Sequence, residues 1–141
     1  MEVGMARQPA PGETDAAASG ADSLRSPRWA LWLAAVLGWF FAGAGVMRLL
    51  PVPFDAALFE SWGLPGWFRA SVGVAELLVG VLALRPATRQ IGLVGIGVVM
   101  VSAATMHAAL GHGLVGPVLA NAPLAAAAFA CAWATRFELL R

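Results

Sequence analysis

A single carboxylate, Glu76, lies in the middle of a mostly apolar run from Trp67 to Leu84. A charged side chain near the centre of a bilayer is costly, at roughly 2.5–3.5 kcal/mol for Asp, Arg or Lys on insertion scales. Such residues are kept mostly where they face other protein or a wet cavity, often near a partner. Arg48 and His107 lie near the ends of neighbouring apolar runs. These three residues form the predicted functional site.

The chemistry open to this group is proton exchange with a bound small molecule, because carboxylates and imidazoles both carry protons. An Arg48–Glu76 pair could equally do no more than fix helix register. His107 could cap a neighbouring carbonyl or lie in the wetted interface. Asn121, in the last apolar run, could simply make an interhelical hydrogen bond. Functional and structural interpretations of these residues both stay open at this point.

A metal centre is not predicted, because such a site needs three or four converging ligands. Glu76, His107 and His112 are expected at different depths, and His112 is interpreted as a solvated loop residue between two glycines. Haem would require axial ligands on facing helices, and His107 has no matching histidine. No cofactor is evident from the residues.

The chain segments that carry Arg48, Glu76 and His107 are strongly apolar. Hydrophobic residues make up 60% of the 141 and charged residues 12%, against about 25% charged in soluble domains. Four apolar runs, about 29–50, 67–84, 91–110 and 117–137, are each long enough to cross a hydrocarbon core of about 30 Å. Backbone groups in lipid must be satisfied within the segment, so all four runs are predicted helices.

The predicted fold is therefore all-α, an integral membrane four-helix bundle. Residues 1–26 are rich in Ala, Gly, Pro and Ser and are predicted to be a disordered cytoplasmic tail. Residues 27–141 are predicted to form the membrane domain. Seven of the nine arginines fall on one side if the chain crosses four times, and the positive-inside rule makes that side, with both termini, cytoplasmic.

Small residues accompany the polar ones on each helix, which favours placing the polar ones inside the bundle. At 1.5 Å per residue, Glu76 lies about 13 Å below the outer end of its helix. Arg48, His107 and Asn121 lie about 3, 5 and 6 Å below the outer ends of theirs. We expect a polar cavity open to the outside, with Glu76 at its floor. The stripes are Arg69, Gly73, Glu76, Gly80 and Ala83 on the second helix, and Gly92, Ile96, Met100, Ala103 and His107 on the third.

The linker 51–66 is predicted to contain a short amphipathic helix on the outer surface. Phe54, Leu58 and Trp62 recur there every four residues, the spacing of one helix face. This helix could be a cap that anchors the first two spans, or a lid over the cavity. Trp62 is accordingly a candidate for the cavity wall.

Several segments together resemble the DoxX-like family of small four-helix bacterial membrane proteins. The resemblance runs from Leu33 to the end of the chain. It implies a site role for Arg48, where the family usually has lysine or arginine, and for Glu76 and His107. Asn121 is not implicated by it. The segments are FAGAGVMRL, PFDAALFESWGLPGWF, SVGVAELLVGVLAL, RPATRQIGL and MVSAATMHAALG.

The resemblance implies a multi-pass protein of the bacterial inner membrane. Some relatives accompany oxidoreductases, and a thiosulfate:quinone oxidoreductase contains DoxX-related subunits. We therefore expect an accessory subunit of a membrane redox complex that binds a quinone, a lipid or another apolar small molecule. The single Cys131 cannot form an internal disulfide or a CxxC pair, which excludes thiol–disulfide chemistry within one chain. The resemblance therefore implies a membrane subunit and not a self-sufficient enzyme.

Two alternatives remain. The protein could be a small membrane enzyme or proton-coupled transporter that uses Glu76 as general acid or proton carrier. It could also be a structural bundle only. The expected partners are the lipid bilayer, a membrane oxidoreductase and further copies of the chain. A net charge of +1 and the lack of a basic stripe argue against nucleic acid.

Overall fold

The computed structural model describes residues 26–112 and 115–136, and every regular element within these ranges is helical. The prediction of an all-helical fold is confirmed. The predicted tail, 1–26, lies outside the described residues except for Ser26. The elements are α2 (Arg28–Leu49), α3 (Pro53–Ser61), α4 (Gly66–Leu84), the 3₁₀ turn η1 (Pro86–Thr88), α5 (Arg89–Ala109) and α6 (Val115–Ala134).

Three of the described helical segments are long and apolar enough to cross a membrane: Arg28–Leu49, Gly66–Leu84 and Pro86–Ala109. Each helix begins and ends within two residues of the corresponding predicted apolar run, apart from α6. In α6 the apolar part, Val118–Ala134, is shorter than the other three, and Pro123 lies within it. Crossing of the membrane by α6 therefore stays a prediction.

The helices α2 and α4 pack together through glycine. A Cβ at Gly80 would lie 2.8 Å from the carbonyl oxygen of Gly38, and one at Gly73 would lie 3.0 Å from that of Gly45. No ordinary side chain fits at such distances, so glycine is what lets the two backbones approach, as in other transmembrane helix pairs. The polar stripe predicted for α4 lies on this packed side of the helix.

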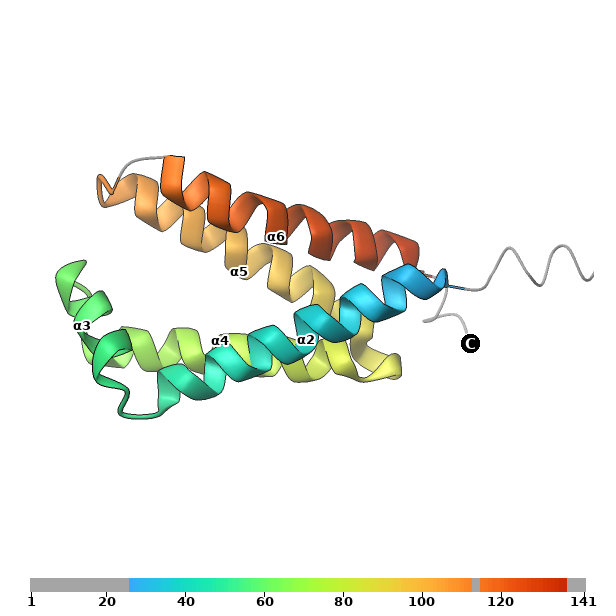
Figure 1. Cartoon of the computed structure of the whole chain (residues 1–141), viewed down its shortest axis with the longest axis horizontal. Helices are drawn as coiled ribbons and strands as arrows, with labels where there is room; N and C mark the ends of the chain where they lie inside the picture. The colour runs from blue at the N-terminus through green and yellow to red at the C-terminus, as the bar shows by residue number, and fades with distance from the viewer. Residues whose placement is uncertain (1–25, 113–114, 137–141) are drawn as a thin grey trace, which may run out of the picture.

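The two helix pairs, α2 with α4 and α5 with α6, converge at one end of the molecule and diverge at the other (Figure 1). We call these the η1 end and the α3 end, after the elements that lie there. At the η1 end, a Cβ on Gly92 of α5 would lie 2.6 Å from the Cα of Ala83 of α4. The buried core lies between the pairs and includes Phe41, Leu93, Ile96, Ala128 and Cys131.

The predicted linker helix is present as α3, with Asp55 in its first turn. Its buried residue is Phe59, which is 4% exposed, whereas Phe54 is 79% exposed. The predicted face of Phe54, Leu58 and Trp62 is thus not the one that packs most deeply against the protein. The turn after α3 uses Gly63 at a φ of 72°, a left-handed conformation that glycine adopts without steric cost.

Candidate functional site: a cavity with an ion pair at the α3 end

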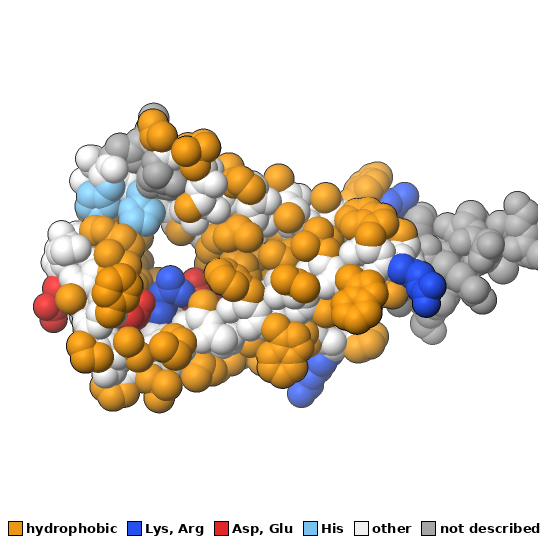
Figure 2. Space-filling view, viewed as in Figure 1, with side chains coloured by type: hydrophobic (Ala, Val, Ile, Leu, Met, Phe, Trp, Pro, Cys, Tyr) orange, Lys and Arg blue, Asp and Glu red, His pale blue; other side chains and the backbone are white. Residues whose placement is uncertain are grey.

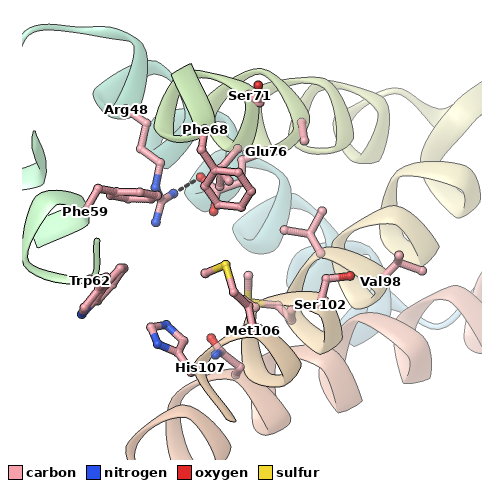
Figure 3. A pocket seen from close by; sticks show the side chains of 16 residues that line it. Arg48, Phe59, Trp62, Phe68, Ser71, Glu76, Val98, Ser102, Met106 and His107 are labelled. Carbon is pink, nitrogen blue, oxygen red and sulfur yellow. Dashed lines mark hydrogen bonds and ion pairs between the residues drawn. The ribbon is translucent and has the colours of Figure 1, made fainter. Parts of the chain in front are cut away.

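A cavity of about 680 Å³ lies between the two helix pairs at the α3 end. This volume is typical of small-molecule pockets, which span roughly 300–1,000 Å³. Figure 3 shows side chains from α2, α3, α4 and α5 that line it. The walls are mainly apolar and include Phe59, Phe68, Val98, Val99, Met100 and Met106.

A buried ion pair forms one wall of the cavity. A terminal guanidinium nitrogen of Arg48 donates to the Glu76 carboxylate (Figure 3). The Glu76 side chain is 4% exposed, and that of Arg48 is 26% exposed. Gly73 makes room for this pair, because a Cβ there would lie 2.9 Å from the Cβ of Arg48. The glycine stripe therefore positions the charged residues as well as joining the helices.

Two further charges, Asp55 and Arg69, extend the ion pair into a network. Arg48 Nε lies 3.9 Å from Asp55 Oδ1, and an Arg69 terminal nitrogen lies 3.4 Å from Asp55 Oδ2. The same Arg69 nitrogen donates to the carbonyl oxygens of Arg48 (2.7 Å) and Leu50 (3.1 Å). Two cations and two carboxylates thus face one another, and the four charges sum to zero.

Sequence reasoning did not assign Asp55 and Arg69 to the site. Arg69 carried a usable signal, because it lies seven residues before Glu76 and therefore on the same helix face. Asp55 carried none, since its approach to Arg48 depends on how α3 folds back over α2 and α4. Arg69 also satisfies carbonyls at the end of α2, which is a common use of basic side chains.

His112 is exposed in the turn after α5, as expected of a solvated loop residue, and its ring also meets that of His107. Their Nδ1 atoms are 3.0 Å apart. The ring of Trp62 meets that of His107 edge-on, with centroids 4.6 Å apart, and lies 5.8 Å from that of His112. The cause is Gly111, whose φ of 72° turns the chain back at the end of α5. Trp62 thereby brings α3 into contact with the end of α5.

The five residues that the sequence singled out, Arg48, Glu76, His107, Asn121 and Trp62, all line the same cavity. Arg48 and Glu76 touch each other, whereas His107 faces them from the other helix pair (Figure 3). The end at which the sequence placed the mouth is crossed by α3 and Trp62. Figure 2 instead shows an opening at the side of the molecule, between the helix pairs, with charged side chains at its edge.

A metal centre of three or more protein ligands is absent from the described part of the chain, where no such group of His, Cys, Asp or Glu side chains converges. The site is therefore an apolar cavity with one charged wall and two imidazoles at its end. Walls of this kind suit a largely apolar molecule whose polar group exchanges hydrogen bonds with a guanidinium and a carboxylate.

Comparison with known proteins gave one match. No curated protein and no solved structure is significantly similar to the chain. The model of the DoxX-like family matches residues 32–132, which is more than two thirds of the chain and contains the whole cavity lining. The resemblance noted in the sequence is confirmed, and the chain belongs to the DoxX-like family.

Proposed function

We propose that the protein is a four-span membrane protein that binds a neutral, membrane-soluble amphiphile of the quinone type in this cavity. The observation that carries the proposal is the combination of an apolar wall and a buried Arg48–Glu76 pair in one cavity of about 680 Å³. The polar group of the ligand would lie at the ion pair. Its apolar part would lie among the side chains of Phe68, Val99 and Met106.

The balance of charges favours a neutral ligand. Arg48, Arg69, Asp55 and Glu76 already compensate one another, so an added charge would stand without a counter-ion in a site of low polarity. A quinone carbonyl can accept a hydrogen bond from the guanidinium, and a quinol hydroxyl can donate to the carboxylate. A lipid with an ester or hydroxyl group offers the same chemistry.

The side opening in Figure 2 supports entry from the bilayer. The helices run along the long axis of the molecule (Figure 1), so an opening between them faces lipid when the helices cross the membrane. The α3 end is covered by α3 itself, through the contact of Trp62 with His107. In this arrangement α3 covers the outer end of the cavity. A ligand dissolved in the membrane reaches the ion pair through the side opening and does not pass α3.

The orientation belongs to the same proposal. Four spans place both termini in the cytoplasm of a bacterial cell, with the α3 end facing outward, because the arginines gather at the opposite end. A reporter enzyme that is active only outside the cytoplasm, fused after Arg141, should be inactive. Activity of that fusion would overturn the four-span orientation.

The role that fits such a site is that of an accessory subunit, which holds a quinone-like molecule for a separate membrane oxidoreductase. The support is family membership together with a single, buried cysteine. Use of Glu76 as a general acid is less well supported, because its carboxylate is engaged by Arg48 and the pair would first have to open. A purely structural bundle would need no cavity beside its ion pair.

The decisive test is ligand binding by matched variants of one helix. The full chain in mild detergent should retain a lipid or quinone in native mass spectrometry and bind decylubiquinone. Ala75 lines the cavity, whereas its neighbour Val74 is 46% exposed on the outside of α4. Ala75→Leu should weaken decylubiquinone binding by at least about tenfold, since the larger side chain would project into the cavity beside Glu76 and clash with a ligand bound there. Val74→Leu should leave it unchanged.

Two results would overturn the proposal. One is equal binding by both leucine variants, which would mean that the molecule adheres to the lipid-facing surface. The other is failure of the wild-type protein to bind decylubiquinone or to retain any lipid. Copurification of an oxidoreductase with the tagged chain from membranes tests the accessory role separately.

A further inference from the structure

The two histidines of the chain form a pair whose geometry the proposed function does not require. His107 lies in the last turn of α5, and the backbone N–H of His112 donates to the carbonyl oxygen of His107 at 3.1 Å. With Gly111 in the left-handed conformation, this bond closes a tight turn. The turn folds the second ring back onto the first. The pair is therefore held by the backbone and does not depend on two free side chains meeting by chance.

The Nδ1–Nδ1 distance of 3.0 Å is also the distance between two ligands of one metal ion. With metal–nitrogen bonds of about 2.0–2.1 Å, two nitrogens bound at a right angle lie about 2.9 Å apart, and at a tetrahedral angle about 3.3 Å apart. The observed separation is closer to the right angle. Square-planar and tetragonal ions such as Cu²⁺ prefer that angle, and Cu²⁺ also binds nitrogen ligands most tightly among the divalent first-row metals.

We propose that His107 and His112 chelate one divalent transition-metal ion, best Cu²⁺, through their Nδ1 atoms at the α3 end of the cavity. In the absence of metal, one neutral ring donates its Nδ1–H to the bare Nδ1 of the other ring. For both Nδ1 atoms to bind a metal ion, the proton of the donor ring moves through water to the Nε2 of the same ring, so both rings bind as neutral imidazoles. Because no third ligand converges there among the described side chains, water completes the coordination. Water has access, since His112 is exposed.

Trp62 provides a fluorescence probe of metal binding and connects the proposed metal site to helix α3. Its ring lies against both imidazoles, at 4.6 and 5.8 Å between centroids. An ion bound by the two rings would therefore lie close enough to this indole to quench its fluorescence. Metal binding would also fix the imidazoles on which the cover helix α3 rests. The proposed metal site uses neither Arg48 nor Glu76, so it goes beyond the amphiphile site. It can be tested independently of amphiphile binding.

The test is a copper titration of the full chain in detergent, after purification by an affinity tag that contains no histidine. Calorimetry should give one Cu²⁺ per chain, and its electron paramagnetic resonance spectrum should be that of a tetragonal site with two nitrogen ligands. His112→Ala and His107→Ala should each weaken binding by at least about tenfold, since even the loss of a supporting residue costs that much. Thr105→Ala is the matched control. Thr105 lies on the same part of α5 with its hydroxyl bonded to Val101, and its replacement should change nothing.

Fluorescence supplies the second readout. Cu²⁺ should quench the wild type more than Trp62→Phe, with equal affinity in both. Equal Cu²⁺ affinity of the wild type and the double histidine variant would overturn the proposal, as would no binding at all, or tighter binding of Zn²⁺ than of Cu²⁺. If His107→Ala does not fold, His112→Ala decides alone, because its side chain is exposed. A variant of Arg48 and Glu76 should lose decylubiquinone but keep copper, so failure of one proposal leaves the other testable.

Discussion

At the η1 end, the two helix pairs touch through glycine and alanine, whereas at the α3 end the pairs stand apart around a cavity with a buried ion pair in its wall. Gly92 meets the backbone of Ala83 at the first end, and Arg48 and Glu76 lie at the second. The difference follows from side-chain size, because small residues admit close backbone approach and large or charged ones do not. The η1 end thus joins the two helix pairs, and the α3 end leaves room between them for a site.

A large effect is expected where the backbones touch. Gly92→Val should cost about 3 kcal/mol of unfolding free energy, because the new side chain would overlap the backbone of Ala83 and overpacking typically costs 1–3 kcal/mol. Gly43→Val is the matched control, since a Cβ at Gly43 meets nothing within 4 Å. Unfolding in mixed micelles measures both. Similar losses for the two would show that helix propensity, and not contact at the η1 end, limits stability.

A matched pair of alanine substitutions compares the interiors of the two ends. Leu93 is 0% exposed in the core, so Leu93→Ala should cost about 2–4 kcal/mol through lost contacts and a new void. Met106 lines the cavity and already has empty space beside it. Met106→Ala should therefore cost about 1 kcal/mol or less. Thermal melts in one detergent give the ranking, and an equal loss at the two positions would argue that the cavity is filled by protein in solution.

The ion pair should give the next effect. Glu76→Gln should cost less than the 3–5 kcal/mol typical of breaking a buried pair, because Arg48 keeps Asp55 at 3.9 Å. Adding Arg48→Met should recover part of that loss. A coupling energy of about 0.5–3 kcal/mol is expected between residues in contact, and strictly additive losses would contradict the pairing.

The same double variant separates function from packing. It should be folded yet fail to bind decylubiquinone, and His107→Ala should share that defect through the opposite wall of the cavity. If the double variant binds normally, the pair serves only to fix the register of α2 and α4.

The smallest effect is expected outside both ends. Deleting residues 1–22 should leave membrane insertion unchanged, because the segment has little apolar surface to bury. The free energy of unfolding should change by no more than about 0.5 kcal/mol. Membrane fractionation and melts of the shortened chain measure this. Loss of insertion on deletion would assign the segment a part in assembly.

Much of the site's membership could be predicted from the sequence. A lone glutamate in an apolar run predicts a partner, and glycines three or four residues from Glu76 predict the packed face on which it lies. Both inferences need only helical periodicity and the cost of a charge in lipid. The structure places Arg48 against Glu76 for that reason. The function of the pair, the four crossings and the partner protein stay predictions.

The rest depended on contacts that periodicity does not contain. Asp55 approaches Arg48 and Arg69 only because α3 folds back, and Phe59, not Phe54, becomes its buried residue. His112 meets His107 through one left-handed glycine. The number of apolar runs could not indicate where two helix pairs would diverge.

What the sequence determined by itself is therefore local: the helices, their limits and the faces that avoid lipid, all set by hydrogen bonding within each segment and by hydropathy. Only the tertiary structure decided how the helices lie relative to one another. This arrangement includes the divergence of the helix pairs, the side opening and the cover formed by α3. These depend on the angle at which whole helices pack. That packing angle results from many weak contacts between residues distant in the chain. It therefore cannot be predicted from any single stretch of sequence.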